Sequence, residues 1–175
     1  ESVVINVNRK NTSQITGDEY ITLAGKPTIL STCMGLQFEI SPAAFYQVNP
    51  EQTEVLYSKA IEYAELTGTE TVFDLYCGVG TIGLLAADKM RKLTIENCGF
   101  VDYEKMGRVY GIESVKGAVV DASRNAVING IVNAEFICGK AEEKINDLLN
   151  GYTDRDGFEI KGKNPDVVII DPPRN

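Results

Sequence analysis

The chain has 175 residues, of which 43% are hydrophobic and 24% charged, as in a globular protein of one ordinary domain. Its net charge of -8 is unfavourable for gripping a nucleic-acid backbone, which requires clustered lysine and arginine. The sequence shows no run of 18 apolar residues and no signal peptide, so we expect neither membrane insertion nor secretion. Histidine is absent and the four cysteines form no C-x-x-C pair. We therefore expect reduced thiols, no metal site and a cytoplasmic location.

Residues 1–40 alternate between apolar and polar positions and predict a small antiparallel β meander. Its three expected strands are Val3–Val7, Tyr20–Leu23 and Leu36–Ile40, with turn residues between them. Three short strands bury too little surface to be stable alone, so this segment should pack against the rest of the chain.

A helix is expected to begin at Asn49-Pro50, because asparagine is a good N-cap and proline is favoured at the first helical position. It should end near Leu66. An apolar strand, Thr71–Leu75, comes next and runs into a glycine-rich turn that opens a second helix.

From this turn onward, strands alternate with helices, which predicts a parallel α/β sheet with helices on both sides, a Rossmann-like arrangement. After the turn we expect a helix at 81–89, an insertion at 90–107 with a short strand at 93–95, a strand at 108–112, a helix at 115–129, a strand at 135–138, a helix at 142–149, a loop at 151–164 and a strand at 166–170.

Ligands of such sheets bind at the carboxyl ends of the strands. The informative residues of this sequence stand there: Tyr76 and Gly78 after the first strand, Glu113 after the second, Lys140 after the third and Asp171 after the fourth. The sequence therefore predicts a nucleotide-type binding site at this end of the sheet.

The glycine turn is compatible with two cofactors. Gly78-x-Gly80-x-x-Gly83 has the spacing of the dinucleotide fingerprint, but Glu113 lies farther away than the acid that NAD binding requires. In the alternative, Glu113 accepts the ribose hydroxyls of S-adenosylmethionine, whose cationic sulfonium and ammonium suit an acidic turn. Asp74, just before the turn, either contacts that cofactor or satisfies N–H groups of the turn. The position of Glu113 and the acidic character of the turn together favour S-adenosylmethionine over NAD.

Five segments, in this order, give the sequence a resemblance to the RNA uridine-5-methyltransferases, the bacterial enzymes that make 5-methyluridine in ribosomal or transfer RNA. They are Phe45-Tyr-Gln-Val-Asn49, Asp74-Leu-Tyr-Cys-Gly-Val-Gly-Thr81, Val109-Tyr-Gly-Ile-Glu113, Asn125-Ala-x-x-Asn129-Gly130 and Asp171-Pro-Pro-Arg174. The match covers about residues 36–175. It implies a β connection at 1–40 and, at 41–175, an S-adenosylmethionine-binding methyltransferase domain that is truncated at its C-terminal side.

The resemblance also implies roles for individual residues. Gln47 would hold the methionine end of the cofactor, Tyr76 and Thr81 would line the first turn, Glu113 would bind the ribose, and Lys140 would flank the adenine through its backbone. Asp171 would stand between cofactor and uracil, with Pro172, Pro173 and Arg174 around it.

Family members use a cysteine thiolate that adds to C6 of a flipped-out uracil, so that C5 takes the methyl group, and a base then removes the C5 proton. Their nucleophile and base come after the Asp-Pro-Pro-Arg segment, and no cysteine of this sequence matches that motif. We therefore expect residues 1–175 to bind S-adenosylmethionine, or its product S-adenosylhomocysteine, without methylating RNA, the substrate of the full-length protein. The last strand should leave an apolar sheet edge that permits self-association.

Three alternatives remain open at this point. An amino-directed methyltransferase would use a variant Asp-Pro-Pro motif, although it would carry an aromatic residue where Arg174 stands. An NAD-binding oxidoreductase domain would use the glycine spacing. A module that binds the cofactor without catalysis would need none of the missing groups.

Overall fold

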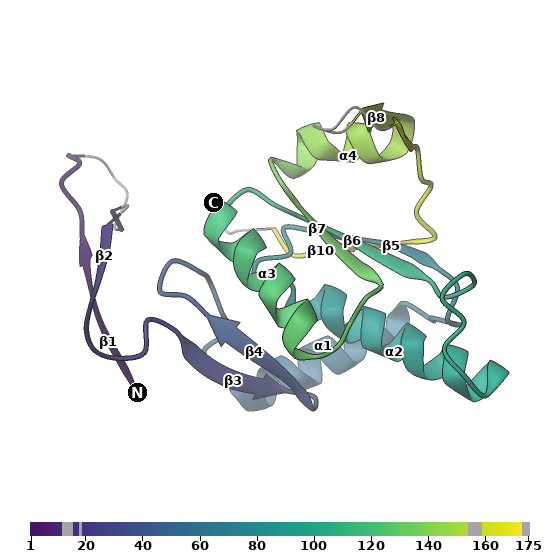
Figure 1. Ribbon diagram of the computed structural model, residues 1–175, viewed down its shortest axis with the longest axis horizontal. Helices are drawn as coiled ribbons and strands as arrows, with labels where there is room; N and C mark the ends of the chain where they lie inside the picture. The colour runs from purple at the N-terminus through teal and green to yellow at the C-terminus, as the bar shows by residue number, and fades with distance from the viewer. Residues whose placement is uncertain (12–15, 18, 154–158, 173–175) are drawn as a thin grey trace.

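A parallel sheet of four strands forms the centre of the molecule (Figure 1). The computed structural model describes residues 1–11, 16–17, 19–153 and 159–172. The strand order is β10 (Val167–Ile170), β5 (Thr71–Leu75), β6 (Arg108–Glu113) and β7 (Ala134–Cys138), and each neighbouring pair is parallel. The predicted α/β sheet is thereby confirmed, and its carboxyl ends all meet at one edge.

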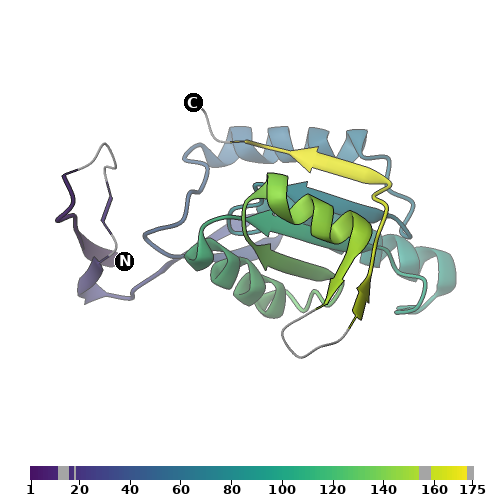
Figure 2. The same cartoon turned by 90° about the horizontal axis from the view of Figure 1, so that it is seen from above.

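Helices cover both faces of this sheet, as the alternation predicts (Figures 1 and 2). Helices α1 (Pro50–Tyr63), α2 (Thr81–Cys98) and α3 (Lys116–Ile128) lie on one side, and α4 (Ala141–Asn150) lies on the other.

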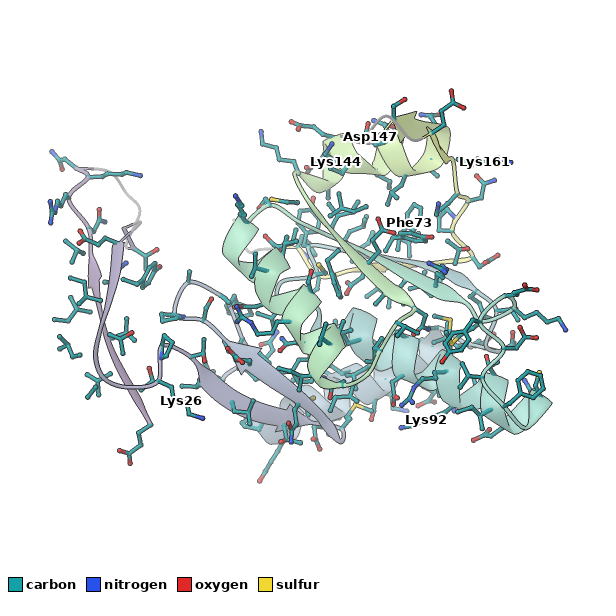
Figure 3. All side chains as sticks on the ribbon, in the orientation of Figure 1. Lys26, Phe73, Lys92, Lys144, Asp147 and Lys161 are labelled. Atoms are coloured by element: carbon teal, nitrogen blue, oxygen red, sulfur yellow. The ribbon has the colours of Figure 1, made fainter. Side chains whose placement is uncertain are left out.

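Successive residues of β5 serve the two cores, because side chains alternate across a strand. Val72 packs into the cluster that α2 shares, whereas Phe73 packs with Ala141 and Leu148 of α4. Figure 3 shows Phe73 between the sheet and α4. Both side chains are fully buried, so this strand has no solvent-facing side.

Helix α1 begins where the sequence predicts. The Asn49 side chain accepts a hydrogen bond from the Gln52 N–H at 3.2 Å, and Pro50 is the first helical residue. The helix ends at Tyr63, before the expected Leu66.

The predicted three-stranded meander is wrong, because the described N-terminal strands form two separate hairpins. β1 (Ser2–Val7) pairs with β2 (Glu19–Gly25), and β3 (Ile29–Cys33) pairs with β4 (Leu36–Ile40). The second hairpin turns through two residues, Met34 and Gly35, both with positive φ (48° and 85°). This geometry matches the twist of the strands but has no Asn-Gly signature in the sequence. In Figure 1 the first hairpin stands apart from the sheet and helices.

Helix α2 is longer than predicted, and the expected strand at 93–95 does not form. Met90 and Thr94 are buried one turn apart, so the helix keeps its inward face beyond Lys89. The chain leaves the helix at Gly99, whose φ of 78° allows its N–H to bond the Ile95 carbonyl at 2.7 Å.

The segment predicted as a loop at 151–164 contains two short strands. β8 (Gly151–Thr153) pairs antiparallel with β9 (Glu159–Lys161) beside α4. Each strand has three residues, which is too short for an alternation that the sequence could display.

Candidate functional site

A cavity of about 720 Å³ opens where β5, β6 and β10 end. Its walls come from the glycine turn and the start of α2, from the residues after β6, from the end of β10, and from the segment that precedes α1. The lining residues are Phe45, Tyr46, Gln47, Tyr57, Asp74, Tyr76, Cys77, Gly78, Val79, Thr81, Ile82, Glu113, Ser114, Val115, Asp171 and Pro172. The cavity therefore lies where parallel sheets bind ligands.

The glycine turn brings main chain to the surface of this cavity. Gly78 has a φ of 55°, and a Cβ built there would have its nearest neighbour, the Phe45 carbonyl oxygen, 4.0 Å away. A ligand can therefore approach the backbone at this position. Gly80 has a φ of 80° and faces the protein interior, where its Cβ would lie 2.7 Å from the Phe136 ring. Glycine is thus needed at the two positions for different reasons.

Asp74 is a buried carboxylate at the base of the cavity. One of its oxygens accepts a hydrogen bond from the Gly83 N–H at 2.9 Å, in the first turn of α2. A Cβ at Gly83 would lie 2.7 Å from the same oxygen, so this close contact requires glycine. Asp74 satisfies an N–H group of the turn and also lines the cavity.

Burial raises the pKa of Asp74 from its ordinary value of 3.8 to about 7, and the carboxylates of Asp171 and Glu113 act in the same direction, against the Gly83 hydrogen bond. The folded protein therefore holds a proton here that the unfolded chain releases near pH 4. Consequently, this group makes the free energy of unfolding fall as the pH rises from about 4 to about 7.

Asp74→Asn should remove this dependence, because asparagine keeps an acceptor for Gly83 and does not ionise. We expect the difference in Tm between the variant and the wild type to grow in favour of the variant between pH 5 and pH 8. Thermal unfolding of both proteins across that range measures it. A difference that stays constant with pH would contradict the assignment of this proton to Asp74.

Glu113 links the glycine turn to the start of α3. Its two carboxylate oxygens accept hydrogen bonds from the Gly78 N–H at 3.1 Å and from the Val115 N–H at 2.8 Å, and the Ser114 hydroxyl donates at 3.2 Å. These hydrogen bonds fix the carboxylate at the carboxyl end of β6. A diol placed beside Gly78 can donate to the same oxygens.

The opposite wall contains a buried hydroxyl that the sequence analysis missed. Tyr57 of α1 is 5% exposed and lines the cavity together with Gln47. Burial raises the pKa of Tyr57 to about 12, and the nearby Asp171 carboxylate acts in the same direction. The signal in the sequence is the spacing of Thr53 and Tyr57, which are four residues apart and form the buried face of α1.

Two further predicted residues flank the glycine turn. Thr81, the first residue of α2, is buried, and Tyr76 donates from its hydroxyl to Glu142 of α4 at 2.6 Å. Tyr76 has a φ of 63°, which is rare for a residue other than glycine and is typical of a constrained functional turn.

Lys140 is the predicted site residue that does not line the cavity. It is the N-cap of α4, and its exposed ammonium lies 3.7 Å from Glu143 Oε1. Pro172 does line the cavity, whereas Pro173 and Arg174 lie outside the described residues.

The charge of the cavity distinguishes between NAD and S-adenosylmethionine, the two cofactors that are compatible with the glycine turn. Asp74, Glu113 and Asp171 line it, and within the described chain no lysine or arginine does. A pyrophosphate would meet the carboxylates of Glu113 and Asp171 and the carboxyl group of Asp74 here, whereas a cation with a ribose would find acceptors for both parts.

The part of the chain that the structure describes lacks two other kinds of feature. In these ranges no group of three or more Cys, Asp or Glu side chains is arranged to hold a metal ion. Likewise, no described helix is long and apolar enough to cross a membrane.

Solved structures with the same arrangement define the class of the fold. A tRNA (uracil-54, C5)-methyltransferase from Pyrococcus abyssi, in complex with S-adenosyl-L-homocysteine, aligns with a TM-score of 0.64 and 29% identity over 98% of this chain and 34% of its own. A SAM-dependent methyltransferase from Agrobacterium tumefaciens aligns with a TM-score of 0.52 and 19% identity over 83% of this chain and 49% of its own. The fold is that of the S-adenosylmethionine-dependent methyltransferases.

Curated relatives of this chain carry a more specific name, that of RNA methyltransferases. An uncharacterized RNA methyltransferase from Caldanaerobacter subterraneus is 47% identical over 100% of this chain and 33% of its own length. One from Enterococcus faecalis is 47% identical over 99% and 32%. The chain thus spans about a third of the curated relatives it matches. No family model matches. The resemblance to RNA methyltransferases drawn from the motifs is confirmed by these relatives.

Proposed function

We propose that this chain binds S-adenosylmethionine and forms the cofactor-binding part of an RNA methyltransferase acting on C5 of uracil. The observation that carries the proposal is the cavity at the strand ends, which is lined by three carboxylates and, within the described residues, by no basic side chain. The structural neighbour from P. abyssi, named as a uracil C5 methyltransferase bound to S-adenosyl-L-homocysteine, supports the choice of cofactor and of base.

In this proposal each wall of the cavity holds one part of the cofactor. Glu113 accepts the ribose hydroxyls, and Gly78 lets the ligand approach the main chain. The carboxylates of Asp74 and Asp171 favour the positive sulfonium and ammonium groups, and the Gln47 amide bonds the methionine end. When bound, the sulfonium supplies the methyl group. Tyr76 and Thr81 line the turn beside it, and Lys140 flanks the adenine from outside the cavity wall.

The domain organisation follows the same division. Residues 41–175 form the cofactor-binding domain, and residues 1–40 form the β connection. The first hairpin, which stands apart from the sheet, supports this division (Figure 1). The second hairpin lies closer to the cofactor-binding domain, because Leu36, Phe38 and Ile40 of β4 pack into the core that contains residues of α1 and α2.

We do not assign the nucleophile of the reaction to any of the four cysteines. Cys77 is the one that lines the cavity, but burial raises the pKa of its thiol and nearby Asp74 and Glu113 raise it further. The other three cysteines do not line the cavity: Cys33 is buried, and Cys98 and Cys138 are exposed. We therefore propose that residues 1–175 provide the methyl-donor site and not the nucleophile.

RNA is the partner in this proposal, and a cytoplasmic location is supported by the four free thiols. Self-association at the β10 edge stays a prediction. Val168 and Ile170 of that edge strand are 43% and 60% exposed.

Titration calorimetry with S-adenosylhomocysteine and with NAD tests the cofactor. We expect S-adenosylhomocysteine to bind with a Kd in the micromolar range, on the order of 8 kcal/mol of binding free energy. NAD should give no heat above dilution at the same concentrations. Binding of NAD with the higher affinity would contradict the proposal.

A further inference from the structure

Side chains of α3 form hydrogen bonds with the edge of β4 that does not pair with β3. Three polar side chains, four residues apart, two from α3 and one from its C-cap residue, each accept a hydrogen bond from a main-chain N–H of β4 or of the residue that follows it. Asp121 accepts from Ser41 at 2.9 Å, Asn125 from Glu39 at 2.7 Å and Asn129 from Gln37 at 2.8 Å. The helix thus takes the place of a neighbouring strand.

The rise of the two elements explains why every fourth helical position meets every second strand residue. Four residues of helix rise about 6 Å and two residues of strand span about 6.8 Å, so the three side chains and the three N–H groups have nearly the same spacing. The two asparagines also donate back to the strand. Asn125 Nδ2 lies 3.2 Å from the Glu39 carbonyl oxygen, and Asn129 Nδ2 lies 2.7 Å from that of Gln37.

Asn125 makes one contact that Asp121 and Asn129 do not. Its Nδ2 donates to the Val79 carbonyl at 3.2 Å, inside the glycine turn. Val79 lines the cavity, whereas the fully buried Asn125 does not. The strand that Asn125 holds leads, a few residues later, to Gln47 on the opposite wall. One side chain thus connects two walls of the cavity without touching its interior.

We propose that Asn125 is a positioning residue for the cofactor site: it holds the glycine turn and the Gln47 segment in a fixed relation. Its effect passes through Val79 on one side and through β4 on the other. The ligand part of this inference rests on the proposed function. It also gives the Asn125-Ala-x-x-Asn129 motif a role that cofactor contact does not explain.

Asn133 provides a matched control. It is 2% exposed, and its Nδ2 also donates to two main-chain carbonyls, those of Ala87 at 3.1 Å and Gly107 at 3.0 Å. Neither carbonyl belongs to β4 or to the glycine turn. Asn125→Ala and Asn133→Ala should therefore both lower the Tm, because each leaves buried carbonyls without donors.

Their effects on ligand affinity should differ. At a temperature where both variants are fully folded, we expect Asn125→Ala to weaken S-adenosylhomocysteine binding by about tenfold, as for the loss of one positioning hydrogen bond. Asn133→Ala should stay within about threefold of the wild type. Equal Kd changes in the two variants would overturn the proposal, since a merely structural role affects the Tm alone.

NMR spectroscopy of the free protein gives a second readout of the position of the glycine turn. If the wild type binds no S-adenosylhomocysteine, the proposed function fails. Asn125 is then judged in the free protein by the amide NMR shifts of Gly78 and Gly80. These should move in Asn125→Ala and not in Asn133→Ala, and unmoved shifts would overturn the proposal.

If Asn125→Ala does not fold, hydrogen exchange of the wild type decides. Because coupling between sites is reciprocal, adding S-adenosylhomocysteine should slow exchange of the Glu39 and Ser41 amides. Exchange of Ile5 and Ile21 in the first hairpin should stay unchanged. Equal exchange of Glu39 and Ser41 with and without ligand would overturn the proposal.

Discussion

Glu113→Ala should weaken S-adenosylhomocysteine binding by about 100-fold, roughly 2.7 kcal/mol, because charge-assisted hydrogen bonds to a ribose are lost. The variant also removes the acceptor that the Gly78 and Val115 N–H groups share, so the turn loses its fixed position. Calorimetric titration of the variant and the wild type measures the change.

Glu96→Ala is the control for this substitution. Glu96 is an exposed glutamate near the end of α2, and it does not line the cavity. Its replacement should leave the affinity within about twofold. If Glu113→Ala also stays within about threefold of the wild type, the carboxylate does not bind the ligand and the proposed orientation is wrong.

Gly80→Ala should lower the free energy of unfolding by about 2–5 kcal/mol, the sum of backbone strain and overpacking. The residue has a φ of 80°, and its Cβ would lie 2.7 Å from Phe136 Cζ and 3.0 Å from Ala122 Cβ. Urea unfolding measures the loss.

A second substitution separates the two causes. Phe136→Leu in the Gly80→Ala background should recover the overpacking against the Phe136 ring and leave the backbone strain and the close contact with Ala122. The control is Gly117→Ala, because a Cβ there meets no atom within 4 Å and lies inside α3, so it should not destabilise. A Gly80→Ala variant as stable as the wild type would contradict the turn geometry.

The sequence predicts the sheet well because its strands carry strong local signals. Val72–Leu75 and Val109–Ile112 are apolar runs bounded by turn residues, and both are buried as expected. The start of α1 is equally local, since Asn49 and Pro50 act within one helical turn.

Elements that depend on tertiary contacts were not predictable. The second half of α2 carries charged residues that are typical of a loop, but Asp88 pairs with Arg91 and Lys92, each at 2.6 Å, along the helix. Met90 becomes an inward residue because of the packing around it. The two hairpins likewise depend on which strands meet, which alternation alone cannot decide.

The site residues also divide into those that the local sequence predicts and those that depend on tertiary packing. Residues at strand ends, such as Glu113 and Asp171, converge because parallel strands end together. Tyr57 reaches the cavity through the packing of α1; its spacing from Thr53 marks the buried face of the helix but not the cavity that this face meets. Lys140 was expected from the resemblance, and its side chain lies outside the cavity wall at the start of α4.

A crystal structure of residues 1–175 grown with S-adenosylhomocysteine would show whether this cavity is the cofactor site. We expect electron density for the ligand in the cavity, with the ribose hydroxyls on the Glu113 carboxylate, the adenosyl part against Tyr76 and Gly78, and the methionine end toward Asp171. Ligand density at another place on the protein, or an unchanged cavity at saturating ligand, would contradict it.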